Sequence, residues 1–317
     1  MARFLVRRIT LALVTLWLLS VIVFLASHAL PGDVGRKILG PFADERAVAS
    51  LDAALGVDKP LLVQYVTWMG GFLHADLGSS LSFHVPVAEL LGRGLLNSVK
   101  LAAVAFVMVV PLGVLGGIVA ALRRGGLADR LITIVGLSAT VVPEFVSSIV
   151  LILVFSVTLK VLPISVQVPP DADPLTQIYH LILPALPLVL VLFGYIARIT
   201  RSGVIEALDA DYTRTAVLKG LPWRTVVVRH VLRNALMPTI AVVATQLGYL
   251  IGGLVIIEFM FNYQGLGRLL LTAAQQRDFP LLQAAVMLVG VVYLTATLVA
   301  DISYSLINPR IRLGGAE

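Results

Sequence analysis

The sequence predicts an all-α, polytopic membrane protein with six transmembrane helices. The chain has 317 residues, of which 58% are hydrophobic and only 13% are charged, whereas soluble domains carry about 25% charged residues. Six stretches are long and apolar enough to cross a bilayer, which requires about 20 residues each. The Lys and Arg residues also cluster in the segments between these stretches, as is typical of cytoplasmic loops.

The six predicted spans are residues 9–29, 98–121, 131–160, 180–199, 236–257 and 281–307. The basic N-terminus and the apolar run after it resemble a signal peptide, but the run is long enough to span, so we interpret it as an uncleaved first helix. The third span is long enough to tilt, or to bend at Pro143. A shorter apolar segment, 61–73, is predicted to be an interfacial or packed helix outside the bilayer.

The distribution of positive charge predicts the orientation of the chain. An even number of spans places both termini on one side. The termini, the 122–130 loop and the 198–235 loop together hold 15 of the 24 Lys and Arg residues. The positive-inside rule therefore predicts cytoplasmic N- and C-termini. The net charge of +6 is explained by these loops, without nucleic acid as a partner.

The inner loop 200–235 contains the most informative motif, DYTRTAVLKGLPW at residues 211–223. Residues 214–219 are compatible with a short helix, Gly220 occupies the position of a helix-ending glycine, and Lys219 suits the negative end of the helix dipole. Pro222 then begins a second helix that returns to the membrane. On composition alone, a basic loop with a glycine turn is an equally available interpretation.

The spacing around Gly220 resembles the cytoplasmic loop of ABC importer permeases, in which Glu-Ala-Ala, three residues, Gly, nine residues and Ile-x-Leu-Pro follow one another. Only Ala216, Gly220 and Leu232 keep that general pattern. The departures resemble the dipeptide and oligopeptide branch, with Asp-Tyr-x-Arg-Thr-Ala-x-x-Lys-Gly, His-x-x-Arg-Asn-Ala and Pro. The residues that match the branch are Asp211, Tyr212, Arg214, Thr215, Ala216, Lys219, Gly220, His230, Arg233, Asn234, Ala235 and Pro238.

The resemblance covers nearly the whole chain. Residues 55–60 and 76–79 resemble the outer segment of the B-type permease of such systems. Residues 258–280 resemble the family's last outer loop, and residues 301–310 resemble its C-terminus. The implied organisation is a first transmembrane helix (1–29), an outer segment (30–97), a permease core (98–308) with the coupling loop 200–235, and a cytoplasmic tail (309–317).

The family resemblance implies the type I ABC importer permease fold in a bacterial cytoplasmic membrane. It implies three protein partners: a second permease subunit, with a heterodimer favoured, ATP-binding cassette ATPase subunits, and an extracytoplasmic substrate-binding protein. ATP is bound by the partners, so no cofactor is expected on this chain. The residues expected to couple to the ATPase are Asp211, Tyr212, Arg214, Thr215, Ala216, Lys219, Gly220 and Leu221.

The expected substrates are dipeptides or oligopeptides, because the motif resembles that branch. Nickel, glutathione and heme-like solutes remain open alternatives, since related permeases serve them. Glu144 is the candidate residue of the translocation path, where it could meet a peptide's amino terminus. A structural role beside Pro143 remains open for it. Asp301, nearer the cytoplasmic end of the last span, is expected to be structural.

Other function classes lack their motifs in this sequence. There is no Gly-x4-Gly-Lys-[Ser/Thr] for ATP binding, and no His-Glu-x-x-His or Gly-x-Ser-x-Gly for a hydrolase, so no catalytic residue is predicted. There is no cysteine, and the histidines do not share a helical spacing, so no metal site is predicted. An ion-driven secondary transporter is the remaining rival, although the two halves show no repeat.

Overall fold

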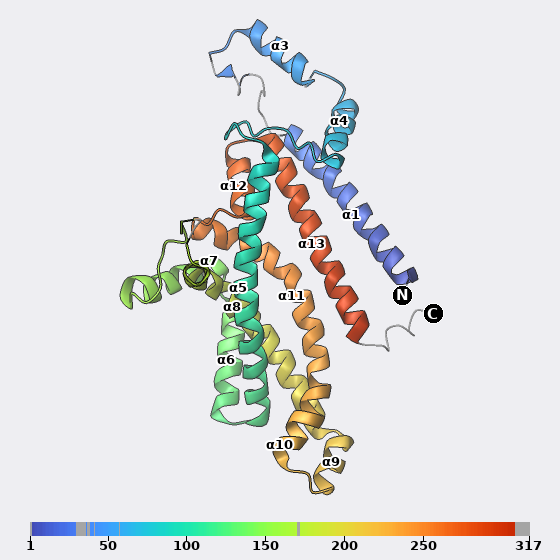
Figure 1. The fold of residues 1–317 in the computed structure, drawn as a ribbon, viewed down its shortest axis with the longest axis vertical. Helices are drawn as coiled ribbons and strands as arrows, with labels where there is room; N and C mark the ends of the chain where they lie inside the picture. Colours follow the sequence, from blue (N-terminus) through green and yellow to red (C-terminus); the bar gives the residue numbers. More distant parts are fainter. Residues whose placement is uncertain are drawn as a thin grey trace. The chain divides into compact units, whose positions relative to one another are not determined.

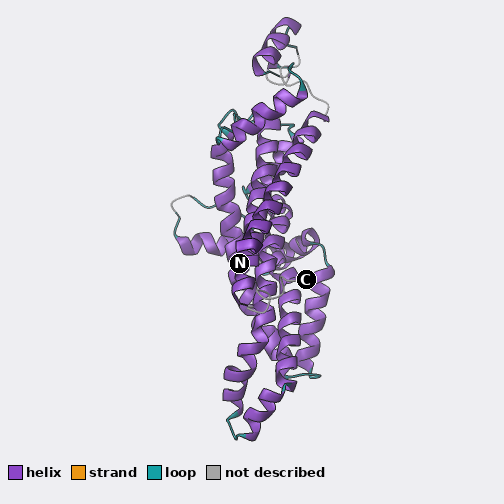
Figure 2. Cartoon of the chain, turned by 90° about the vertical axis from the view of Figure 1, so that its right-hand side faces the viewer, coloured by secondary structure: helices purple, strands orange, loops and turns teal. Residues whose placement is uncertain are grey.

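The computed structural model describes residues 2–29, 36, 39–40, 42–56, 58–169 and 172–307. The predicted tail, 309–317, lies outside these residues. The described residues form helices and loops (Figure 2), and the isolated bridge between Ser79 and Pro86 is their only β pairing. The predicted all-α class is confirmed.

Five of the described helices are long and apolar enough to cross a membrane, and they become six if one sharply bent pair is counted as a single span. The five are Val6–Ala29, Val87–Leu122, Pro174–Asp209, Trp223–Gln246 and Phe279–Ser303, and the pair is Leu127–Val141 with Glu144–Thr158. The pair is bent by 114°. The break falls at Pro143, as predicted, because proline lacks the N–H that would continue the helix.

The chain divides into two compact units, Met1–Ser98 with Gln264–Leu294 and Val99–Tyr263 with Thr295–Glu317. The helices of the first unit are α1 (Ala2–Ala29), α3 (Glu45–Leu55), α4 (Leu61–Leu73), the start of α5 (Val87–Leu122), α12 (Leu266–Gln275) and most of α13 (Phe279–Ile307), as Figure 1 shows. The segment 61–73 is a helix, as predicted. It packs on α1 through Tyr65, whose hydroxyl lies 2.8 Å from Ser20 Oγ.

Asp278, which is fully buried, organises the first unit. Its Oδ2 accepts hydrogen bonds from Ser80 Oγ at 2.5 Å and from the Ser82 backbone N–H at 3.0 Å. Its Oδ1 lies 3.3 Å from the backbone N of Leu281, in the first turn of α13. One carboxylate therefore fastens the 80–82 loop to the start of the last helix.

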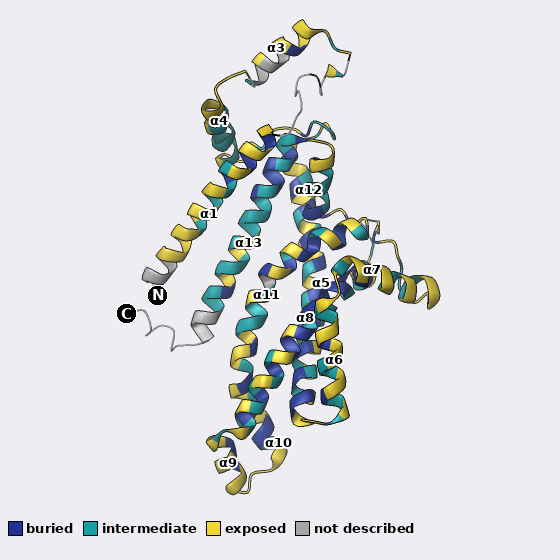
Figure 3. Cartoon of the chain, turned by 180° about the vertical axis from the view of Figure 1, so that it is seen from behind, coloured by how far each residue is buried: buried dark blue, intermediate teal, exposed yellow. Residues whose placement is uncertain are grey.

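The second unit is built around α8 (Pro174–Asp209), which Figure 3 shows as the most continuously buried helix of this unit. In α8, 67% of the most apolar 18-residue stretch is buried, against 17–28% of the corresponding stretches in the other four spans. The other elements are the rest of α5, α6 (Leu127–Val141), α7 (Glu144–Leu151), the π-helical segment η1 (Ile152–Thr158), α9 (Asp211–Leu218), α10 (Trp223–Thr225), the π-helical segment η2 (Val226–Val231) and α11 (Leu232–Met260).

Close helix contact explains one of the glycines around α8. A Cβ on Gly117 of α5 would lie 2.5 Å from the carbonyl oxygen of Ala197 and from Cβ of Thr200, both on α8. Only glycine lets the two backbones approach this closely, which is a common device in membrane bundles. The helices extend beyond the predicted spans: α5 begins at Val87 rather than at residue 98, and α8 continues to Asp209, past residue 199.

Candidate functional site

Residues 211–223, which contain the sequence motif, form the α9 tip of the second unit. Within this unit, α9 and α10 lie at one end, beyond α8 and the start of α11 (Figure 1). The predicted short helix is present as α9, Asp211–Leu218, and the predicted returning helix begins at Trp223 as α10. The loop therefore consists of the short helix α9 with one turn before it and one turn after it.

Local signals in the sequence explain where α9 ends. Gly220 has φ of +75°, a conformation that glycine adopts at little cost. Its N–H donates to the carbonyl of Val217 at 2.9 Å, and the N–H of Leu221 donates to the carbonyl of Ala216 at 3.4 Å. This pair of bonds is the Schellman motif. The prediction that Gly220 terminates the helix is confirmed.

One face of α9 holds it against the rest of the unit. Thr213 and Ala216, three residues apart, are 3% and 5% exposed. Thr213 Oγ1 donates a 2.6 Å hydrogen bond to the carbonyl of Ala207 near the end of α8. Ala216 belongs to a small apolar core with residues of α5, α8, η2 and α11: Ala121, Val204, Ala207, Val226, Val231 and Ala235. The short helix is thereby fixed to its support.

The opposite face of the α9 tip is exposed and apolar. Leu218 is 82% exposed and Trp223 is 57% exposed, and Tyr212, Val217 and Leu221 are also exposed. Large apolar side chains gathered at one place on a surface mark an interaction site more often than scattered ones do. Leu218 lies within 212–221, the stretch expected from the sequence to contact the ATPase, whereas sequence reasoning did not single out Trp223 as a surface residue.

Exposed cations surround these apolar side chains. Arg214, Lys219 and Arg224 are all exposed. Arg214 faces Asp211 at 4.0 Å, and both side chains are highly exposed, so water screens this pair strongly. The α9 tip therefore presents an apolar centre with a mostly positive rim.

The structure brings the predicted coupling residues together on this one short element. Asp211, Tyr212, Arg214, Thr215, Lys219, Gly220 and Leu221 are exposed. Ala216 differs from them, because it is buried and contacts the core rather than the surface. Its small size suits that packing position.

A partly buried ion pair joins α6 to α8, and sequence reasoning did not find it. Asp129, in the first turn of α6, is 4% exposed. Arg201 of α8 holds it with two hydrogen bonds, Nε to Oδ1 at 2.6 Å and Nη2 to Oδ2 at 2.8 Å. The backbone N–H of Gly125 also donates to Oδ2 at 2.8 Å. The α5–α6 turn is thus fastened to α8.

Glu144 stands directly after the break between α6 and α7 and is partly buried. Its Oε1 accepts a 2.9 Å hydrogen bond from the hydroxyl of Tyr249 on α11. Its backbone carbonyl accepts from Ser148 Oγ at 2.7 Å. The carboxyl therefore joins α7 to α11. Neither role expected for Glu144 from the sequence, lining the translocation path or a structural role beside Pro143, included this contact.

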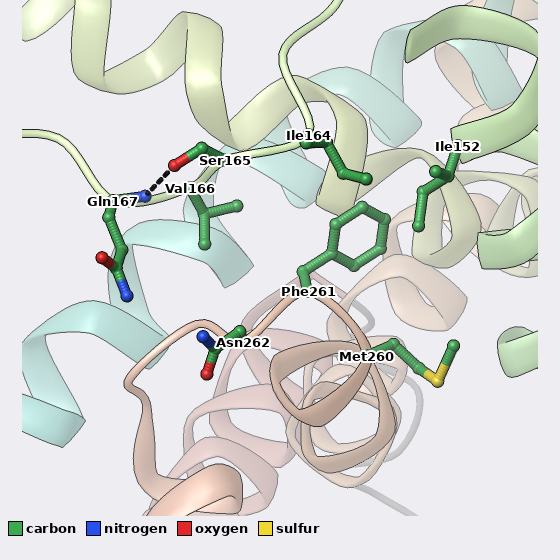
Figure 4. A pocket seen from close by; sticks show the side chains of 8 residues that line it. All are labelled: Ile152, Ile164, Ser165, Val166, Gln167, Met260, Phe261 and Asn262. Atoms are coloured by element: carbon green, nitrogen blue, oxygen red, sulfur yellow. Dashed lines mark hydrogen bonds between the residues drawn. The ribbon is translucent and has the colours of Figure 1, made fainter. Parts of the chain in front are cut away.

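A cavity of about 370 Å³ lies elsewhere in the second unit, between η1, the 164–167 loop and the corner after α11 (Figure 4). Figure 4 shows the Phe261 ring beside Ile152 and Ile164, with the amides of Gln167 and Asn262 toward the other side. Its lining carries no charged side chain among the described residues. Beside this corner, burial and then nearby Glu258 raise the pKa of Tyr263 to about 12, so its phenol stays neutral.

Comparison with known proteins gives a consistent result. Residues 113–313 match the family described as binding-protein-dependent transport system inner membrane component, and residues 1–101 match the N-terminal family of the same systems. The probable peptide ABC transporter permease protein y4tP of Sinorhizobium fredii is 35% identical over 98% of this chain and 100% of that protein. The glutathione transport system permease protein GsiC of Escherichia coli K12 is 36% identical over 98% and 99%.

Among solved structures, an amino acid ABC transporter with histidines matches 70% of this chain and 94% of its own chain, at 17% identity and a TM-score of 0.49. The family matches together cover nearly the whole chain, and both relatives align over their full lengths. The chain therefore belongs to the inner membrane components of binding-protein-dependent transport systems, and it is a multi-pass ABC importer permease of the oligopeptide type.

Proposed function

We propose that this chain forms half of the translocation path of a peptide importer and is driven by partner ATPases that grip the α9 tip. The observation that carries the proposal is the two-sided α9 helix. Thr213 and Ala216 fix one side to the unit, and Leu218 stands on the other side, 82% exposed. A helix held rigidly from behind, with an apolar front, is suited to transmit movement from a protein bound to it.

The proposal assigns ATP chemistry to the partners. The sequence has no phosphate-binding loop of the form Gly-x4-Gly-Lys-[Ser/Thr]. The exposed side chains of the α9 tip are instead mostly apolar or cationic. A second permease subunit would complete the path, and a substrate-binding protein would dock on the outer side. In this arrangement both termini and the α9 tip face the cytoplasm, as the excess of Lys and Arg in these segments favours.

Short peptides are the proposed substrates. One relative is named as a probable peptide permease and another as a glutathione permease. Glutathione is itself a tripeptide, so the two names share a chemistry of amide bonds and charged ends. The uncharged, partly apolar cavity of Figure 4 would suit the middle of such a solute better than its ends.

The test is co-purification of the ATPase with wild-type permease and with Leu218→Asp. Leu218 is highly exposed, so the variant should fold normally, while a carboxylate placed in a desolvated interface should weaken ATPase association about tenfold or more. Leu127→Asp is the matched control, because Leu127 is 74% exposed in the first turn of α6. Equal ATPase recovery with both variants would contradict docking at the α9 tip.

A further inference from the structure

The stretch of α8 from Arg201 to Asp209 contacts two different parts of the second unit. Arg201 makes the two-bond contact with buried Asp129 at 2.6 and 2.8 Å. Asp129 also accepts the N–H of Gly125 and lies 3.4 Å from Thr133 Oγ1. These contacts come from the α5–α6 turn, from α6 and from α8, so the carboxylate joins the three segments at one point.

The same stretch of α8 also holds α9 in place. The carbonyl of Ala207 accepts the 2.6 Å bond from Thr213 of α9. Val204, which is fully buried, packs with Ala216 of α9 and with Val226 of η2. Movement of α9 must therefore move this part of α8, unless both the hydrogen bond and the apolar core are broken.

The far end of α6 leads to the candidate path residue. Helix α6 runs from Leu127 to Val141, and α7 begins at Glu144 after the 114° bend. Glu144 then bonds to Tyr249 of α11 at 2.9 Å. Contacts thus connect α9, α8, Asp129 and α6, and the chain continues from the end of α6 through the bend to Glu144.

We propose that Asp129 and Arg201 are positioning residues. They lock α6 to the stretch of α8 that holds α9, so that α9 and α6 move as one rigid element. The proposal rests on the proposed function, because it requires an ATPase acting on α9. It adds how that action reaches the membrane-embedded part of the chain.

The geometry of the pair suits this role better than a general stabilising role. A guanidinium that holds a carboxylate through two parallel bonds fixes orientation as well as distance. An ion pair withdrawn from water is also weak support for stability, because desolvation offsets much of the attraction. Here Asp129 is buried and the Arg201 side chain is 32% exposed. The neighbouring pair, Arg124 Nη1 to Asp209 Oδ2 at 3.4 Å, has side chains 63% and 71% exposed. It makes one long bond in water and serves as a control.

The main experiment uses the complete transporter reconstituted in vesicles, with its partner permease, ATPase and binding protein. It measures ATP hydrolysis and the number of peptides imported per ATP hydrolysed. The double variant Asp129→Asn/Arg201→Gln removes both charges together, so no unpaired buried charge is left to prevent folding. We expect normal assembly and basal ATPase, with peptides imported per ATP reduced about fivefold or more.

Two further variants complete this comparison. Arg201→Lys keeps the charge and loses the two-bond geometry, and it should give an intermediate ratio. Asp209→Asn should keep the wild-type ratio. A wild-type ratio in the double variant would overturn the inference while leaving the proposed function intact. If the wild-type chain recruited no ATPase, it is the proposed function that would fail.

A second measurement first tests the rigid element with Asp129 and Arg201 unchanged. This chain has no cysteine, so two introduced cysteines are its only labelling sites, and the partner subunits are used in cysteine-free form. Val228 lies on η2, which shares its apolar core with α9 and α8 and so should move with them. Ile134 of α6 and Val228 are 61% and 59% exposed, and Ile134→Cys/Val228→Cys can carry two spin labels. The distance between the labels should be the same in ATP-free and ATP-bound complexes. The distribution of distances should broaden when Asp129→Asn/Arg201→Gln is added. A distance that differs between the two nucleotide states while Asp129 and Arg201 are intact would refute the rigid element.

Discussion

Gly220 shows how a single residue shapes the α9 tip. Its φ of +75° lies where other L-residues are strained, by roughly 1–2 kcal/mol. A Cβ built on it would meet nothing within 4 Å. Within this chain, glycine is therefore required for the backbone turn and not for space. Any further intolerance of a side chain at this position must come from a partner.

Replacing Gly220 by asparagine separates these two causes. Asparagine tolerates positive φ better than other residues, so Gly220→Asn should leave the melting temperature of the permease nearly unchanged. If the ATPase covers the turn, the added side chain should reduce ATPase co-purification about tenfold. Gly125→Asn is the control, since Gly125 has φ of +77° and also no neighbour within 4 Å of a built Cβ.

The outcome of that comparison has a clear alternative. Equal ATPase recovery for Gly220→Asn and Gly125→Asn would show that Gly220 serves only the backbone conformation. Gly220→Val adds a third comparison, because a β-branched residue at positive φ should also destabilise the end of α9. Loss of ATPase with valine but not with asparagine would assign the effect to strain.

Sequence reasoning succeeded at Gly220 and failed at Asp129 for a physical reason. The signals that end α9 are local: a glycine, a lysine before it and a proline after it, all within a few residues. The Asp129–Arg201 contact joins positions 72 residues apart, and nothing in the local pattern around either one marks the pair. Its existence depends on how α6 packs on α8, which a single sequence does not display.

At the scale of elements, the spans were predictable and their ends were not. Hydropathy detects only the apolar part of a helix, whereas α8 continues to Asp209 and α5 begins at Val87. These extensions hold their shape through packing, as with Val87, which is fully buried in the core of the first unit. The position of the bend at Pro143 was predictable because it has a local cause, but its angle was not.

The contact between α7 and α11 gives a prediction about the path. If Glu144 meets the amino terminus of the peptide, Glu144→Gln should lower uptake of peptides with a free amino terminus and leave uptake of N-acetylated peptides nearly unchanged. Tyr249→Phe removes only the 2.9 Å hydrogen bond, which contributes about 0.5–1.5 kcal/mol, so its effect should be smaller. Uptake of both peptide classes into vesicles is the measurement.

The control and the contrary outcome follow from the same contact. Tyr249→Phe leaves the carboxylate charge in place, so it separates the charge of Glu144 from its role in joining α7 to α11. Equal loss with both variants, for both peptide classes, would assign Glu144 to helix packing. Unchanged transport by Glu144→Gln would remove it from the path altogether.

At the scale of the whole molecule, the two units have different contents. The second unit contains α8, the α9 tip and Glu144, and so holds the residues proposed for coupling and for the path. The first unit contains the 80–82 loop, which Asp278 fastens to α13. All of the predicted outer segment, 30–97, falls in the first unit.

The orientation of the chain in the membrane can be tested directly, because the protein has no cysteine. Asp58 of the predicted outer segment and Lys219 of the α9 tip are both exposed, so Asp58→Cys and Lys219→Cys should each react readily with a thiol reagent. In intact spheroplasts, a membrane-impermeant maleimide should label Asp58→Cys, and it should label Lys219→Cys only after the membrane is opened. The reason is the positive-inside rule, since the α9 tip lies in the most basic loop. Labelling of Lys219→Cys in sealed spheroplasts would reverse the orientation and would place the α9 tip out of reach of any cytoplasmic ATPase.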